Sequence, residues 1–573
     1  QPRRVEIFSH LPLPEREVLR PRYVTKTPPC NGACPVGTDV EGVLFLLAKE
    51  KREEAAYLLL QTNPLPSVCG RVCFHPCENA CNRGKYDQPV SIQAIERFLG
   101  DTSQCLPNRA PDTGFRVAVI GSGPAGLSCA YHLALLGHKV TIFEAMPEPG
   151  GLLRYGIPSY RLPKEVLRRE IDRILSLGIK MRTGVKVGRD VSFKDLHAFD
   201  ALFFATGAHK PKGLKIPNEG LQGVWRGIEF LKSLNEGNPP VVGKRVAVIG
   251  GGNTAIDVCR SLIRLGAQPL LLYRRRKEDM PAHPSEVEEA LAEGVKMEFL
   301  VSPVEILGDE EVKGLRLVRM YAESLRKDGR SRVQPVEGSE FVLEVEAVVV
   351  AIGEEPDLEL PLDLRESGKV FFGGDLLDQP RTVAHAIGSG RKGALEIHRF
   401  LTGGEIKLFE ERVPKEVPLE EIDITAFPRS ERTSLRRLSP EEARKSFREI
   451  SEGISEEEVL REAKERCFHC GSCTECDFCM ISCPQRAILK EGTTYRVDPE
   501  RCNLCRLCAV ACPRSVIEIP IVESCVGCRY CLEAFGCPAL RMVDGRVEID
   551  RKICVDCGLC VYACNQGAIR EVR

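Results

Sequence analysis

Short hydrophobic runs followed by helical periodicity occupy the middle of the chain. The β-branched run 116–120 precedes an apolar helix and a strand at 139–143, and the run 245–249 precedes a helix ending at Leu265 and a strand at 269–273. Buried runs of this length that alternate with helices are typical of parallel sheets covered by helices. The pattern therefore predicts two α/β units of similar design.

Further hydrophobic runs predict how these units are connected. The segments 200–207 and 347–353 are buried strands ending in small turns, and 370–375 is a third short strand. Together they predict that the second unit is inserted between two halves of the first. From 408 to about 465 the chain becomes charged and 455–464 has the pattern of an exposed helix, so this stretch is predicted to be a linker that ends in a helical strap.

Composition excludes several classes of function. Lys and Arg number 80 against 81 Asp and Glu, so the chain lacks the net basic charge that nucleic-acid binding favours. No apolar stretch approaches the ~18 residues of a membrane span, and the segment beginning Gln1-Pro2-Arg3-Arg4 lacks the apolar core of a signal peptide. We therefore expect a cytoplasmic protein with no membrane span and no nucleic-acid partner.

Cysteine is the informative residue type. Of the 27 cysteines, 24 lie in two dense zones, from Cys30 to Cys81 and from Cys467 to Cys564. In a chain without a secretory signal so many cysteines indicate metal ligation rather than a disulfide framework.

The glycines after the two hydrophobic runs indicate dinucleotide binding. Gly-x-Gly-x-x-Gly at Gly121, Gly123 and Gly126 lies between a strand and a helix, and Glu144 after the next strand can accept from a ribose hydroxyl. The second turn has Gly250, Gly252, Asn253 and Thr254, and its next strand ends in Arg274 and Arg275, which suit a ribose 2′-phosphate. NADPH is therefore favoured, and NADH with a solvated basic turn is the alternative.

The C-terminal cysteines have the spacing of bacterial ferredoxins with two [4Fe–4S] clusters, in which the fourth cysteine of each run serves the other cluster. The predicted ligand sets are Cys473, Cys476, Cys479 with Cys512; Cys502, Cys505, Cys508 with Cys483; Cys525, Cys528, Cys531 with Cys564; and Cys554, Cys557, Cys560 with Cys537. Cys467 and Cys470 stay unassigned. The last module, Cys525–Cys564, differs in the five residues between Cys531 and Cys537 and in Asn565, which replaces the usual proline, and we expect this module to face a partner protein.

One segment resembles a known family. The sequence 150–164, GGLLRYGIPSYRLPK, is similar to the flavin-side motif of the glutamate synthase small subunit, dihydropyrimidine dehydrogenase and the large subunit of NADH-dependent ferredoxin:NADP oxidoreductase. The resemblance covers about residues 25–400. It implies that Gly151 and Arg161 lie against FAD and that Arg274, Arg275 and Gly353 lie near NADPH. Thr206, Gly207, Gly374 and Asp375 complete the predicted flavin site.

The resemblance also implies iron–sulfur clusters in the N-terminal zone. By the family pattern Cys34, Cys73 and Cys77 hold one cluster together with Glu96. Cys30, Cys69 and Cys81 are left for a second cluster that lacks a fourth ligand, because the family's opening C-x2-C pair is absent upstream of Cys30. One or two clusters are therefore expected here, and zinc bound by these cysteines is the alternative.

The fold class expected is multidomain α/β, with two Rossmann-like domains of the glutathione and thioredoxin reductase type between an α-helical iron–sulfur domain and α+β ferredoxin-like domains. The expected boundaries are 1–110 for the helical domain, 111–240 and 356–405 for the FAD domain, 241–355 for the NAD(P)H domain, 406–466 for the linker and helix, and 467–520 and 521–573 for the two ferredoxin modules.

The function expected is an oxidoreductase that exchanges hydride between NADPH and FAD and carries single electrons through [4Fe–4S] clusters. No acid–base pair or nucleophile for another reaction is evident, so we expect a subunit whose catalytic partner subunit, or a ferredoxin-type acceptor, completes the reaction. A free-standing NAD(P)H:ferredoxin oxidoreductase, with or without electron bifurcation, is the alternative. A non-enzymatic scaffold is disfavoured by the intact motifs.

Overall fold

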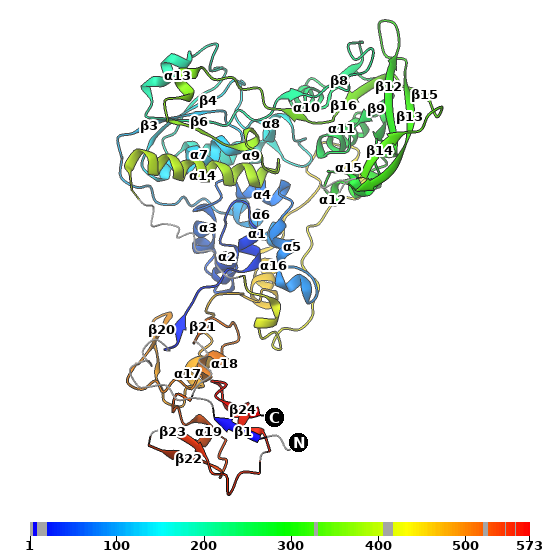
Figure 1. Ribbon diagram of the computed structural model, residues 1–573. Coiled ribbons are helices and arrows are strands. Elements are labelled where there is room, and N and C mark those ends of the chain that lie inside the picture. Colours follow the sequence, from blue (N-terminus) through cyan, green and yellow to red (C-terminus); the bar gives the residue numbers. More distant parts are fainter. Residues whose placement is uncertain are drawn as a thin grey trace.

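The computed structural model describes residues 4–7, 20–325, 331–404, 416–519, 525–533, 535–544, 546–555 and 557–572. Two α/β units lie side by side at one end of the molecule, a helical domain lies beneath them, and the cysteine-rich C-terminal modules form the opposite end (Figure 1). The two chain termini lie close together among these modules (Figure 1). Within the described residues no helix is long and apolar enough to cross a membrane.

The first α/β unit is built on a parallel five-stranded sheet of order β18-β6-β3-β4-β5. Its strands β3 and β4 coincide with the two hydrophobic runs predicted at 116–120 and 139–143. β18 pairs with β6 although the second unit lies between them in sequence, which is the expected insertion. The elements are β3 (Arg116–Ile120), α7 (Pro124–Leu135), β4 (Lys139–Phe143), α8 (Leu152–Tyr155), α9 (Lys164–Leu175), β5 (Lys180–Arg182), β6 (Ala201–Phe204), β18 (Val370–Phe372) and α14 (Val383–Thr402).

The second α/β unit has a parallel sheet of order β11-β10-β9-β16-β8 and a separate antiparallel sheet in which β12 and β14 flank β13 and β15 also pairs with β13. Its elements are β8 (Val224–Arg226), α10 (Gly227–Asn235), β9 (Arg245–Ile249), α11 (Asn253–Arg264), β10 (Gln268–Tyr273), α12 (Pro284–Ala292), β11 (Lys296–Phe299), β12 (Val301–Leu307), β13 (Gly314–Leu325), β14 (Ser331–Pro335), β15 (Phe341–Glu344) and β16 (Ala347–Val350). The antiparallel sheet was not expected from the sequence.

The helical domain consists of short helices joined by cysteine-bearing turns. Its elements are α1 (Pro29–Ala33), α2 (Val40–Ala48), α3 (Arg52–Leu60), α4 (Pro66–Val72), α5 (Pro76–Ala80) and α6 (Ile92–Thr102). The C-terminal segment adds α16 (Glu456–Arg461) and η7 (Glu462–Arg466), a single turn of π-helix. Val459 and Ala463 are fully buried in the core of this domain.

The helix predicted at 455–464 is exposed on one side only. Glu456 and Glu457 are exposed, whereas Val459 and Ala463 lie one helical turn apart and are buried in the core formed by α2, α3 and α6. The segment 416–466, which we call the strap, is bonded along the helical domain: the amide of Asn82 donates to the carbonyl of Val417 (2.9 Å) and Arg97 to that of Ser451 (3.0 Å).

The N-terminal residues also differ from the expected division. Arg4–Ile7 (β1) and Arg22–Tyr23 (β2) were expected within the helical domain, but they pair antiparallel with Ile569–Val572 (β24) and Ile517–Glu518 (β21). The expected boundaries at 405/406 and 520/521 fall on or beside residues outside the described part. The C-terminal modules contain α17 (Phe478–Ile481), β19 (Ile488–Glu491), β20 (Thr494–Val497), α18 (Leu507–Val510), α19 (Tyr530–Glu533), β22 (Leu540–Val543), β23 (Arg546–Ile549) and α20 (Leu559–Ala563).

Candidate functional site

A cavity of about 1060 Å³ lies over the carboxyl ends of β3 and β4. The glycine turn after β3 forms one wall, with Gly121 at φ +102°. A side chain at Gly121 would lie 2.4 Å from the carbonyl oxygen of Ala205, so only glycine permits this turn. The space beside Gly123 is open, and Gly126 packs behind the turn against Gly121. The backbone can therefore approach a pyrophosphate group closely.

Glu144 is positioned by this turn. Its carboxylate is buried and accepts from the Ser122 backbone N–H at 2.8 Å and from the Met146 N–H at 2.7 Å. These bonds hold the side chain at the cavity wall, where it can meet a ribose hydroxyl.

Most other predicted flavin residues line the same cavity. They are Gly151, Thr206, Gly207, Gly374 and Asp375. Burial raises the pKa of Asp375. The cavity combines a volume of about 1060 Å³ with the glycine turn and the acidic group that dinucleotide binding requires, so the residues present fit FAD.

Arg161 is the exception and corrects one prediction. Its guanidinium is buried and pairs with Asp257 on α11 (2.7 Å) and with Glu286 on α12 (3.0 Å), so it does not line the cavity. Both carboxylates belong to the second α/β unit. Because a buried cation needs nearby anions, Arg161 joins the two units instead of contacting the flavin.

The second glycine turn is built like the first. Gly250 follows β9 at φ +148°, Gly252 precedes α11, and Asn253 begins this helix and accepts from the His283 N–H at 3.0 Å. Thr254 follows Asn253 on α11, and Gly353 follows β16 at φ +104°.

The two arginines after β10 differ in exposure. Arg274 is exposed, whereas Arg275 is buried and its Nε donates to the carbonyl oxygen of Ser331 at 2.9 Å. Arg275 is thus anchored to β14 of the antiparallel sheet, and Arg274 carries its charge at the surface beside the turn.

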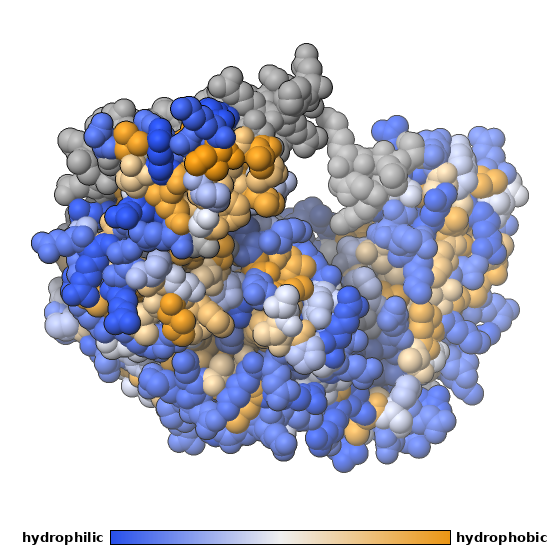
Figure 2. All heavy atoms as spheres, turned by 90° about the horizontal axis from the view of Figure 1, so that it is seen from below, coloured by the Kyte–Doolittle hydropathy of each residue, from blue (hydrophilic) through white to orange (hydrophobic). Residues whose placement is uncertain are grey.

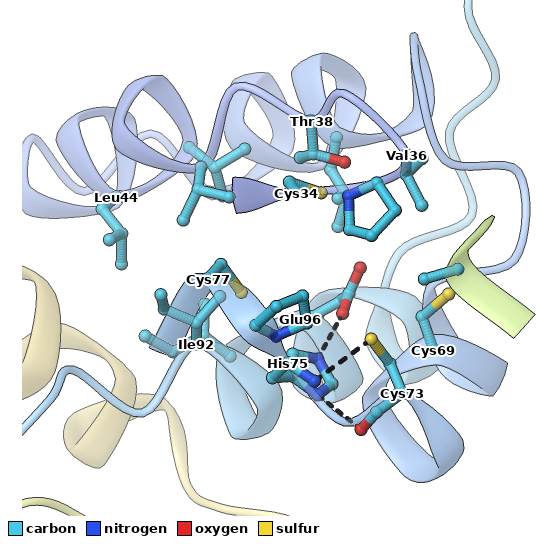
Figure 3. Close-up of a pocket in the computed structure, with 17 residues that line it drawn as sticks. Cys34, Val36, Thr38, Leu44, Cys69, Cys73, His75, Cys77, Ile92 and Glu96 are labelled. Carbon is cyan, nitrogen blue, oxygen red and sulfur yellow. Dashed lines mark hydrogen bonds and ion pairs between the residues drawn. The ribbon is translucent and has the colours of Figure 1, made fainter. Parts of the chain in front are cut away.

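The first thiol site is a cavity of about 40 Å³ in the helical domain (Figure 3). Cys34, Cys69, Cys73 and Cys77 line it together with Glu96. Both oxygens of the Glu96 carboxylate are held, one by the Asn63 amide (2.7 Å) and the other by His75 Nε2 (2.8 Å).

The position of Cys69 corrects its predicted grouping with Cys30 and Cys81. Cys69 lies in α4 and Cys73 caps this helix, where its N–H donates to the Cys69 carbonyl at 3.0 Å. Residues four apart on a helix share a face, so both thiols point into the same cavity. At His75 the backbone turns to φ +44°, which redirects the chain before Cys81.

The C-terminal thiols gather as the spacing predicts for swapped ligation. Three separate cavities are lined by Cys473, Cys476, Cys479 and Cys512; by Cys483, Cys502, Cys505 and Cys508; and by Cys525, Cys528, Cys531 and Cys564. The fourth set is Cys537, Cys554, Cys557 and Cys560, in which burial and then the other three thiols raise the pKa of Cys560.

The donor chemistry of these sites fits iron–sulfur clusters. Every cysteine of the chain is a free thiol, and each C-terminal set offers four of them. Among the described residues no three His, Cys, Asp or Glu side chains are arranged to hold a single metal ion. Thiolates are the ligands of [4Fe–4S] clusters, so the residues present fit this group.

Comparisons with known proteins agree with these features. Residues 115–390 match the family described as pyridine nucleotide-disulphide oxidoreductase, residues 22–106 match dihydropyrimidine dehydrogenase domain II with a 4Fe-4S cluster, and residues 472–516 match the 4Fe-4S dicluster domain.

Three relatives are similar over most of the chain. The NADPH-Fe(3+) oxidoreductase subunit beta of Geobacter sulfurreducens is 36% identical over 78% of this chain and 76% of its own length. The NADP(+)-dependent formate dehydrogenase subunit beta of Moorella thermoacetica is 38% identical over 78% and 70%, and the glutamate synthase [NADPH] small chain of Escherichia coli is 36% identical over 65% and 89%.

The fold and the sites define an NAD(P)H-dependent flavin and iron–sulfur oxidoreductase, as predicted from the sequence. Two dinucleotide-binding units, a helical cluster domain and a ferredoxin-type array occur together in one chain. The chain belongs to the family of NADPH-dependent oxidoreductase subunits that contains these three relatives.

Proposed function

We propose that this chain is the electron-transfer subunit of a larger complex, in which NADPH and FAD exchange hydride and the thiol sites carry single electrons to or from a partner enzyme. Two of the relatives carry the designation subunit beta, and one of them is a formate dehydrogenase subunit. FAD, when bound, takes up two electrons as hydride and passes them on singly.

One observation carries this proposal: the first turn of α14 separates the flavin cavity from the first thiol cavity. Val383 and Ala386 line the flavin cavity, whereas Ala384 between them lines the cavity of Cys34 and Cys73. A flavin and a cluster held on opposite sides of one helical turn are close enough for direct electron transfer.

The remaining thiol sites continue this path. The Asn503 amide donates to the Cys528 carbonyl at 2.8 Å, and the Asn565 amide donates to the Cys505 carbonyl at 3.2 Å. These bonds hold two neighbouring cluster sites together. The Asn565 side chain thus contacts the preceding module.

The ligand assignments are proposed as follows. The four C-terminal sets hold one cluster each, and Cys34, Cys73, Cys77 and Glu96 hold another, with Cys69 as the competing fourth ligand in the same cavity. The reducing conditions that such thiols require support a cytoplasmic location.

A partner surface is proposed at the last cluster site. Around Cys557, which is exposed, lie Ile553, Val555, Leu559 and Tyr562, whose exposed fractions are 50%, 84%, 56% and 85%. Figure 2 views the molecule from this end and shows hydrophobic residues among hydrophilic ones. An exposed apolar group beside a redox site suits docking of the catalytic partner subunit.

Substitution of Cys528 by serine tests the path. We expect this variant to lose one cluster and to transfer electrons to the isolated partner complex at least about tenfold more slowly, because the exit lies beyond this site. NADPH should still bleach the flavin in a stopped-flow experiment. Cys105→Ser serves as the control, since Cys105 belongs to none of these sets. If Cys528→Ser transfers electrons to the partner complex at the wild-type rate, electrons leave the protein at another cluster site.

The native mass of the protein purified from its source distinguishes this proposal from the alternative, a free-standing NAD(P)H:ferredoxin oxidoreductase. A complex purified from its source with additional subunits supports the proposal, whereas an isolated chain that reduces ferredoxin favours the alternative.

A further inference from the structure

Four cysteines lie close together at the end of the strap and belong to none of the sites described above. Cys30 and Cys81 come from the helical domain, and Cys467 and Cys470 follow η7. The matches to iron–sulfur families cover 22–106 and 472–516, so Cys467 and Cys470 fall outside both.

Packing brings the two pairs together. Cys467 is 6% exposed and is part of the hydrophobic core of the helical domain, against which Cys30 and Cys81 also pack. The Asn82 amide, adjacent to Cys81, donates to the Cys470 sulfur at 3.6 Å. Arg83 donates to the Arg466 carbonyl at 3.3 Å, which fixes the strap beside this pair.

Electrostatics agree with this geometry. Burial raises the pKa of the Cys30 thiol, and the thiols of Cys81, Cys467 and Cys470 raise it further. Burial raises the pKa of Cys470 as well, with Cys467 and Cys81 among the neighbours that add to it. The four thiols are therefore close enough for each to affect the pKa of the others. Their thiolate forms are unfavourable in this buried site unless a cation lies beside them.

The loop at Cys467 repeats a feature of the first thiol site. Cys73-Phe-His75 and Cys467-Phe-His469 have the same sequence, and both histidines have positive φ, +44° and +49°. In both loops the histidine backbone N–H donates to the cysteine sulfur, at 3.3 Å and 3.4 Å. Hydrogen bonds of this kind to ligand sulfurs tune the potential of a bound cluster.

We propose that Cys30, Cys81, Cys467 and Cys470 together hold a [4Fe–4S] cluster whose ligands come from opposite ends of the chain. The other cysteines nearby are already used, since Cys473 lines a different cavity with Cys476, Cys479 and Cys512. Cys30 lies four residues before Cys34 of the first thiol cavity, and Cys470 lies three residues before Cys473 of the first ferredoxin set. This cluster deepens the proposed electron path by supplying the step between the helical domain and the array.

The experiment compares full-length proteins purified without oxygen, with iron, acid-labile sulfide, zinc and FAD measured per chain. Cys467→Ser/Cys470→Ser and Cys30→Ser/Cys81→Ser are each expected to lose about four iron and four sulfide. The variant with all four substitutions should lose no more than either pair, because the residues act as one unit. Cys105→Ser is the control and should keep all of its iron.

Three results would overturn the proposal: wild-type iron content in the Cys467→Ser/Cys470→Ser protein, a loss of about eight iron atoms in the fourfold variant, or zinc in place of iron. If one double variant does not retain FAD, the iron content of the other double variant decides the question, because it removes the other two ligands of the same proposed cluster. Bleaching of the wild-type flavin by NADPH tests the proposed function separately from the iron count.

Discussion

Glu170 on α9 of the FAD unit supports a helix of the neighbouring domain. Its buried carboxylate accepts from the backbone N–H groups of Ser67 (2.8 Å) and Val68 (3.0 Å), which begin α4 and have no local side-chain cap. Cys69 follows directly and Cys73 ends the helix. We therefore expect Glu170 to hold the first thiol site in place without touching it.

The carboxylate also pairs with Arg173 at 3.0 Å, and the two backbone bonds alone set a lower limit on the cost of removing it. Each buried N–H left without a partner costs about 1–3 kcal/mol, so Glu170→Leu should destabilise the domain by about 2–6 kcal/mol. Gly100 packs so tightly here that a Cβ on it would lie 2.4 Å from the Ser67 nitrogen, which leaves little room for a replacing water. Glu170→Gln should cost less, because its amide oxygen still accepts one bond.

Thermal loss of cluster absorbance measures the effect, together with iron per FAD. A shift of roughly 2–4 °C per kcal/mol predicts a midpoint about 4–24 °C lower for Glu170→Leu. Glu165→Leu, at an exposed position on the same helix, is the matched control and should unfold like the wild type. If Glu170→Leu keeps its iron and its midpoint, the carboxylate does not support α4.

Three further predictions concern cofactor choice, pH and docking. Arg274→Ala should raise the KM for NADPH about ten- to a hundredfold and leave that for NADH unchanged; equal effects on both would contradict a 2′-phosphate contact. Burial lowers the pKa of His132 to about 4, so its neutral form stabilises the fold above pH 6.5 and this contribution is lost as the pH falls towards 4. The free energy of unfolding of His132→Gln should therefore depend less on pH between about 4 and 6.5 than that of the wild type. The same pH dependence in both proteins would contradict this prediction. Val555→Asp/Tyr562→Asp should slow transfer to the partner complex at least about tenfold while NADPH still reduces the flavin; unaltered transfer would remove the proposed docking surface.

Local spacing explains what the sequence could predict. Three of the C-terminal thiol sets each line one cavity, and the thiols of the fourth are neighbours of Cys560, because their members recur at fixed short intervals. The turn at Gly121 is specified by its own strand and helix. Chemistry that depends on a few consecutive residues is visible without a structure.

Long-range pairing explains what the sequence missed. Cys69 faces the same cavity as Cys73 because the two residues are four positions apart on one helix. Arg161 does not line the flavin cavity because it forms an ion pair with Asp257 of the inserted unit. No further ligand for Cys30 could be found upstream in the sequence, because the neighbouring thiols of Cys467 and Cys470 follow the strap, more than 400 residues later. A charged segment looked like a linker because its few apolar residues, such as Val459, are spaced to face one narrow surface.

The pairing of β1 with β24 has a consequence for biosynthesis. Arg4 pairs with Val572, more than 560 residues later in the chain, so β1 is synthesised long before its partner β24. At about 5–20 residues per second this delay is on the order of half a minute to two minutes. During that interval the strand is an open edge that can pair wrongly with other nascent chains. Shielding of β1 until β24 has been synthesised would prevent this mispairing.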